Sequence, residues 1–164
     1  MSPSSERLLE IYLGDHLAAA TAGVELVRRA ARNNAGNDYG AALGAVGAEI
    51  EEDRRTLQRV VHSLGFDEPR LKQVVARVGE KLGRLKLNGQ VRGYSPLSRV
   101  LELEALSVGI AGKIALWESL QSLSVTARLP DTDLAQLAER GRRQREEVEK
   151  QRLDAVREAF GQRP

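Results

Sequence analysis

Residues 95–120 read SPLSRVLELEALSVGIAGKIALWESL, and this stretch decides how the rest of the chain must pack. It begins with a serine followed by a proline. This pair predicts the start of a helix, because serine caps the first turn and proline fits the first helical position. From Leu97 onward, apolar residues cover almost every side of the predicted helix. A helix that is apolar on every side is a buried one. We therefore expect the helix over 95–124 either to form the centre of the fold or to turn part of its surface to another subunit.

Three more segments have apolar residues at three- and four-residue steps, the period of an amphipathic helix. They cover 4–33, 38–65 and 132–160. Asn37 or Asp38 is expected to cap the second of these helices, and Asp131 or Asp133 the last. The chain thus contains four long helices, and its composition and length suit one domain over 1–164 with an ordinary core.

The connection between the second and third helices is long, because it covers residues 66–94. A short helix is expected near 69–82, followed by a loop over 83–93 with turn residues at Asn88 and Gly89. The short connections on either side make two helical hairpins. The predicted fold class is therefore all-α, with a crossover between the two hairpins of a four-helix bundle.

This layout resembles that of the ferritin-like superfamily, whose bundles also join two hairpins by one long crossover. The resemblance implies an up-down four-helix bundle and, where the metal ligands are present, iron storage, peroxide chemistry or oxygen activation. A di-iron site needs a Glu from each of two helices and Glu-x-x-His from each of the others. The residues three before His16 and His62 are Leu13 and Arg59. The chain therefore resembles a divergent member without the di-iron motifs, and we expect no cofactor.

Charged residues flank the predicted apolar stripes at similar levels of the bundle and indicate a polar layer. The predicted polar core consists of His16, Asp53, Glu102, Lys113 and Arg152. Residues equally far from a tight loop lie side by side in antiparallel helices, so levels can be compared. On this basis we expect His16 to pair with Asp53, and Glu102 with Arg152, because buried charges persist only when paired.

Lys113 needs a carboxylate from the other hairpin, and Glu49 and Asp53 are the candidates. The apolar stripe of the helix over 132–160 is interrupted by polar side chains, and these need hydrogen-bond partners if the helix is to pack firmly on the bundle. These are Gln144, Arg145, Gln151 and Arg152. An alternative interpretation makes some of the same acidic groups and a histidine a site for one divalent ion, or His16 a general base. The candidate ligands in that case are His16, Glu49, Asp53 and Glu102.

Basic residues are concentrated in the middle of the chain, where residues 54–99 hold 11 basic and 3 acidic side chains. The predicted basic surface consists of Arg70, Lys72, Arg77, Lys81, Arg84, Lys86 and Arg92. Two interpretations stay open. The block neutralises acidic helices of the same bundle or of a second copy, or it binds a nucleic acid or another anionic partner. The aromatic residues of single-strand binders are missing from it, which favours the first.

Glycines in the predicted helices also have two interpretations. Gly40, Gly44 and Gly47 give the second helix one side of small residues, and the first helix has alanines and Gly23. Glycine in a helix costs about 1 kcal/mol relative to alanine. Either the first two helices approach closely, or a cavity for a flat apolar ligand lies in the middle of the bundle, enlarged by Gly109 and Gly112.

The chain has no cysteine, no secretory signal at its start and no apolar run of membrane-spanning length, so a cytoplasmic protein without a membrane partner is expected. Its expected function is that of a non-enzymatic helical protein that acts through self-association, with a dimer favoured, or through a protein partner. The alternatives are a metal or redox protein that uses His16 and nearby carboxylates, and an anionic-partner or nucleic-acid binder that uses 54–99.

Overall fold

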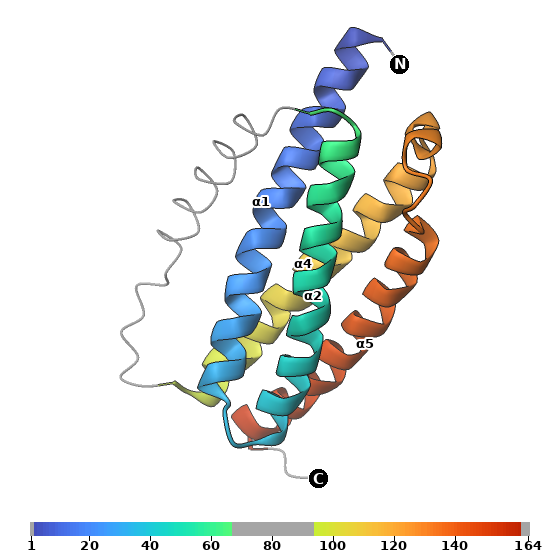
Figure 1. Cartoon of the computed structure of the whole chain (residues 1–164). Helices are drawn as coiled ribbons and strands as arrows, with labels where there is room; N and C mark the ends of the chain where they lie inside the picture. Colours follow the sequence, from blue (N-terminus) through green and yellow to red (C-terminus); the bar gives the residue numbers. More distant parts are fainter. Residues whose placement is uncertain (1, 67–93, 162–164) are drawn as a thin grey trace.

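The computed structural model describes residues 2–66 and 94–161, and this part of the chain consists of helices without a strand (Figure 1). In chain order the elements are α1 (Pro3–Asn33), α2 (Asp38–Ser63), α4 (Pro96–Gln121), the short 3₁₀ helix η1 (Ser124–Arg128) and α5 (Leu134–Ala159). The long helices begin and end within three residues of the expected positions. The helix expected near 69–82 and the loop over 83–93 lie outside the described residues. None of the described helices is long and apolar enough to span a membrane.

Each long helix begins at a side chain that accepts a hydrogen bond from the backbone of its first turn. Ser95 accepts from the Ser98 N–H at 3.1 Å, as the Ser-Pro pair predicts. Of the two pairs of cap candidates, Asn37 and Asp133 are the actual caps, and Ser2 caps α1. Local sequence therefore sets where the helices start.

The helices form two antiparallel hairpins, α1 with α2 and α4 with α5, and α1 also faces α4 while α2 faces α5 (Figure 1). Side-chain contacts show that both of these further pairs are antiparallel. They are Tyr12–Ser119 and Arg29–Glu102 between α1 and α4, and Tyr39–Glu158 and Asp53–Arg140 between α2 and α5. As a result α2 and α4 run in the same direction, which explains why a long connection joins them.

The core is divided into two apolar clusters, one toward each end of the bundle. Trp117 and Leu13, both fully buried, belong to the cluster nearer the start of α1. Leu43, Leu103 and Val148 belong to the other. Between the two clusters lies a polar layer, which is described with the candidate site.

The end of the bundle near the α1–α2 turn is tied together by hydrogen bonds around the buried Asn34 side chain. Its amide donates to the Tyr94 hydroxyl at 2.8 Å and accepts from Arg99 Nε at 2.7 Å. Arg99 also binds Glu158 at 2.6 Å and lies over the Tyr39 ring. Burial and the neighbouring Glu158 carboxylate raise the pKa of Tyr39 to about 12. All four helices thus meet in one network.

One side of α4 is apolar and open to solvent, so only part of this helix lies in the centre of the fold. Leu97, Leu101 and Val108 expose 51%, 44% and 73% of their surface. Of the two alternatives that the sequence leaves open for 95–124, complete burial at the centre of the fold does not hold for this side. These three residues, with the exposed Ala105 between them, are called the α4 apolar face below.

The α2 glycines divide between the two interpretations that the sequence leaves open. A Cβ at Gly40 would lie 2.2 Å from the backbone oxygen of Asn34, and one at Gly47 would lie 3.3 Å from Val27. These two glycines permit close approach of α2 to α1 and the turn before it. A Cβ at Gly44 would meet nothing within 4 Å in the described structure.

We predict opposite effects for alanine at two of these glycines. Gly44→Ala should raise the free energy of unfolding by about 1 kcal/mol, because alanine favours the helix and meets no neighbour. Gly40→Ala should lower it by about 1–3 kcal/mol, because the backbone of Asn34 must move. Urea unfolding of both variants measures the two changes, and equal signs would contradict the assignment.

Candidate functional site

A carboxylate in the middle of the bundle is surrounded by groups from other helices. Asp53 of α2 is only 2% exposed. Its Oδ2 accepts from Lys113 Nζ of α4 at 2.5 Å, and its Oδ1 accepts from Arg140 of α5. Two cations therefore bind one buried carboxylate, and the expected partner of Lys113 is confirmed as Asp53.

Gln144 of α5 completes this layer and is itself 2% exposed. Its Nε2 donates to Asp53 Oδ2 at 3.2 Å and to Glu49 at 2.9 Å, while its Oε1 accepts from Lys113. The polar interruption of the α5 stripe at this position thus has its partners. Asp53, Lys113, Arg140 and Gln144 are called the ion-pair layer below.

Gly141 explains how Lys113 reaches across to Asp53. A Cβ at this glycine would lie 2.8 Å from Ile114 and 3.8 Å from the Lys113 side chain. The missing side chain therefore makes room for α4 side chains against α5. Burial lowers the pKa of Lys113, and the Asp53 carboxylate opposes that effect. The short contact with the carboxylate is that of a charge-assisted hydrogen bond.

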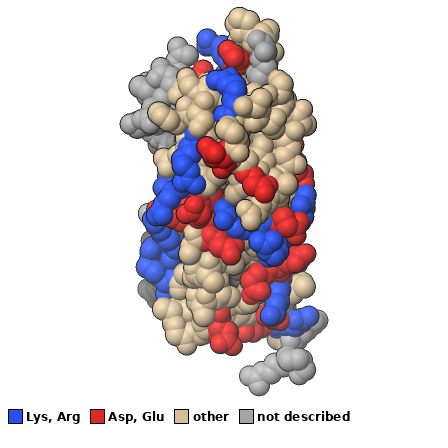
Figure 2. All heavy atoms as spheres, turned by 45° about the vertical axis from the view of Figure 1, so that its right-hand side comes forward, with Lys and Arg blue, Asp and Glu red and all other residues tan. Residues whose placement is uncertain are grey.

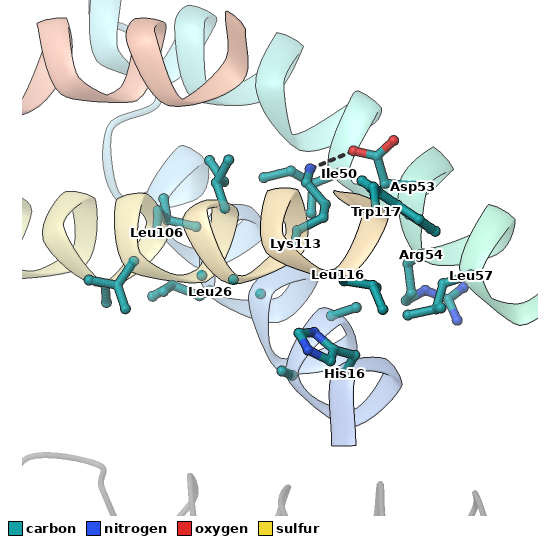
Figure 3. Close-up of a pocket in the computed structure, with 18 residues that line it drawn as sticks. His16, Leu26, Ile50, Asp53, Arg54, Leu57, Leu106, Lys113, Leu116 and Trp117 are labelled. Atoms are coloured by element: carbon teal, nitrogen blue, oxygen red, sulfur yellow. Dashed lines mark hydrogen bonds and ion pairs between the residues drawn. The ribbon is translucent and has the colours of Figure 1, made fainter. Parts of the chain in front are cut away.

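The expected pair of His16 and Asp53 is wrong. Both residues line the same cavity, but the His16 ring lies away from the carboxylate, which is joined to Lys113 (Figure 3). His16 instead packs edge-on against Tyr12, with ring centroids 4.5 Å apart. Burial lowers the pKa of His16, and the nearby Asp15 carboxylate opposes this effect. Lys113 and Arg140 already bind the two Asp53 oxygens.

The expected pair of Glu102 and Arg152 is also wrong, because Glu102 points to α1 and not to α5. Glu102 accepts from Arg29 at 2.9 Å and from Tyr94 at 3.0 Å. Arg152 binds Glu149 on its own helix at 2.6 Å, and Glu104 lies 3.8 Å away. Both α1 and α5 pack against α4, and the level of a residue along α4 does not decide which of the two helices its side chain faces.

Arg140 is a member of the ion-pair layer that the sequence interpretation missed. It lies one turn before Gln144, on the same side of α5. That spacing is a usable signal, because a polar group inside an apolar stripe suggests that its neighbour one turn away shares the same environment.

Within residues 2–66 and 94–161, no group of three or more His, Asp or Glu side chains is placed to hold a metal ion. The four candidate ligands do not converge on one point, although Glu49 and Asp53 both accept from Gln144 Nε2. His16 lies on α1, Asp53 is bound by Lys113 and Arg140, Glu49 accepts from Gln144, and Glu102 accepts from Arg29. Positive groups beside Asp53 oppose the approach of a further cation.

At the level of the ion-pair layer, the α1 side of the bundle contains a cavity of about 280 Å³ (Figure 3). Its walls come from α1, α2 and α4 and are mostly apolar. Of the glycines in the cavity alternative that the sequence leaves open, Gly23, Gly109 and Gly112 line this cavity. Gly44 and Gly47 of α2 line a second cavity of about 260 Å³ between α1 and α2 instead.

The seven residues of the predicted basic surface all lie outside the described residues. The described face that Figure 2 presents carries Lys and Arg interspersed with Asp and Glu. Among the described residues, Arg28 and Arg54 both bind Glu51. Such ion pairs neutralise charges of the described helices locally.

No protein-family model, curated protein or solved structure matches this chain. What the residues can do chemically therefore rests on the geometry above.

We predict that removing the buried carboxylate is strongly destabilising. Asp53→Ala should lower the free energy of unfolding by about 3–5 kcal/mol, because Lys113 and Arg140 lose their shared counterion. Glu52→Ala, at the exposed neighbouring position, should change it by less than about 0.5 kcal/mol. Denaturant unfolding at pH 7 measures both, and a loss below about 1 kcal/mol for Asp53→Ala would show that the layer is well solvated.

We also predict a pH dependence that depends on His16. Because the folded pKa lies below the ordinary value of 6.5, the unfolded chain binds more protons between these two values. The free energy of unfolding should therefore fall as the pH drops from 6.5 through the folded pKa. His16→Gln should remove this part of the pH dependence, while His62→Gln, at an exposed position, should keep it. Thermal unfolding between pH 7.5 and 5 compares the three proteins, and identical profiles for wild type and His16→Gln would contradict the assignment.

Proposed function

We propose that this chain is a non-enzymatic cytoplasmic protein of ferritin-like layout, without a functional di-iron site, that acts by association with a second copy of itself. The observation that carries the proposal is the α4 apolar face, whose large side chains are exposed on a helix that is otherwise the core of the bundle. Contiguous exposed apolar surface is typical of interaction sites.

The ferritin-like part of the proposal is supported by connectivity. Two antiparallel hairpins with α2 and α4 in the same direction are the arrangement that a single long crossover produces. The proposal of no di-iron site is supported by the chemistry of the layer at mid-bundle, where a carboxylate binds Lys113 and Arg140. The lack of cysteine suits a reducing compartment.

The spacing of the α4 apolar face supports a partner helix. Leu97, Leu101, Ala105 and Val108 follow one another at steps of four, four and three residues, so they lie along one side of α4. A two-fold axis that crosses α4 near Leu101 would bring the same stripe of both copies together, since such an interface is self-complementary. Glu102 and Glu104 flank the stripe and would lie at its polar rim.

We predict that Leu101→Glu converts a dimer into a monomer and weakens association at least about 100-fold, because each dimer would bury two new carboxylates near Glu102 and Glu104. Leu153→Glu is the matched control, since Leu153 of α5 is 42% exposed and Leu101 is 44% exposed. It should leave the dimer intact.

Analytical ultracentrifugation over a range of concentrations measures the association of all three proteins. Thermal unfolding checks that the variants are folded, as expected for substitutions at half-exposed positions. A monomeric wild type, or a Leu101→Glu variant that still dimerises, would contradict self-association through this face. Loss of the dimer only in Leu153→Glu would place the interface on α5.

A further inference from the structure

The helices α1 and α4 are joined by side-chain contacts at two separate levels. The Tyr12 hydroxyl donates to Ser119 at 3.3 Å, and Arg29 Nε donates to Glu102 at 2.9 Å. Along each helix these contacts are about 25 Å apart, from the rise of 1.5 Å per residue. The segments 12–29 and 102–119 therefore lie side by side along the whole length between these two contacts.

Small residues occupy the middle of both segments without bringing the helices into close contact. A Cβ built on Gly23, Gly109 or Gly112 would meet no described atom within 4 Å. Glycine inside a helix is unfavourable by about 1 kcal/mol relative to alanine. Close approach explains Gly40 and Gly47 of α2, but nothing in the described structure requires these three to be glycine.

The space that these glycines leave open is the cavity beside the ion-pair layer. Its volume of about 280 Å³ is roughly twice the ~150 Å³ of an apolar cavity that accepts benzene. Leu26, Ile50, Leu57 and Leu106 contribute apolar walls, and the 73% exposed Val108 stands at the rim. A molecule of one or two rings fits this volume and has access from the α1–α4 side.

The charged groups of the wall already have partners of opposite charge. Lys113 binds Asp53 at 2.5 Å, and Arg54 binds Glu51 at 2.9 Å. A charged ligand would have to compete with these ion pairs and would lose its hydration in an apolar cavity. A neutral ligand has neither cost.

Two polar groups of the wall are left without a hydrogen-bond partner among the described residues. The Trp117 indole Nε1 is fully buried and unpartnered. The half-buried His16 ring contacts Tyr12 only through its edge-on packing. Both residues line the cavity. The half-buried imidazole of His16 is the candidate donor to one acceptor atom of a ligand, whereas the Trp117 Nε1 is closed to water-sized molecules.

We propose that the cavity between α1, α2 and α4 binds a neutral, flat, apolar molecule of one or two rings that carries one hydrogen-bond acceptor. This site is formed within one chain and does not rest on self-association. It gives Gly23, Gly109 and Gly112 a common cause, because an occupant fills the volume that the missing side chains leave.

The test compares two probes of nearly equal shape and size at pH 7. The first is 2-acetylnaphthalene, a neutral bicyclic ketone, and the second is 2-naphthoate, its anionic counterpart. The ketone should raise the midpoint of thermal unfolding by about 5–10 °C at about 100 times its Kd. It should also change the fluorescence of Trp117, the only tryptophan of the chain, in a saturable way. The anion should bind at least tenfold more weakly.

Two variants that fill the cavity locate the effect. Gly112→Leu and Ala19→Leu add apolar side chains to opposite walls and should abolish the shift while the protein remains folded. Gly44→Leu adds the same side chain at an open glycine outside the cavity wall and should retain it.

Three results with the wild type, the cavity-filling variants and the two probes would each overturn the proposal. They are the absence of a saturable shift in the wild type, an unchanged shift in both cavity-filling variants, and binding of the anion as tight as that of the ketone. Leu101→Glu should keep the shift whether or not the wild type dimerises. Loss of the shift in a folded Leu101→Glu variant would overturn a site formed within one chain. Failure of the dimer alone leaves the ligand result intact, so the two proposals are tested separately.

Discussion

The buried carboxylate of Asp53 is the constraint on which the rest of the structure depends. A carboxylate at 2% exposure persists as an ion only beside positive charge, and α4 and α5 supply it through Lys113 and Arg140. This one carboxylate of α2 thereby constrains the axial position and the rotation of both α4 and α5. Gln144 and the small Gly141 fit the same geometry, since one closes the network and the other makes room for it.

The layer is one-sided, and this has consequences for the opposite side of the bundle. Its members come from α2, α4 and α5, whereas α1 contributes small residues at that level. Apolar clusters above and below the layer hold α1 in place, so the middle can remain unfilled. The cavity and the α4 apolar face adjoin each other there and share Ala105 and Val108. Both proposed activities are therefore located on the α1–α4 side.

The two pairing errors have a common physical origin. Distances from a tight loop give the level of a residue well. Counted from a loop centre near residue 129, Lys113 lies level with Arg145, and it contacts the adjacent Gln144. They do not give the direction in which a side chain points. Glu102 binds Arg29 of α1 because α4 is turned that way, and His16 faces Tyr12 on its own helix. A rotation of a helix by one residue moves a side chain by about 100° and selects a different neighbour.

The sequence by itself determined the four long helices, the cap at Ser95, a choice of two candidates for each of two further caps, and the need of Lys113 for a carboxylate from the other hairpin. These features depend on residues close together in the chain or on the general cost of an unpaired charge. Only the tertiary structure decided that Arg140 joins Asp53, that Gly23, Gly109 and Gly112 line the cavity, and that one side of α4 is left exposed. Those outcomes depend on how each helix is rotated against three others, and residues distant in sequence settle that rotation together.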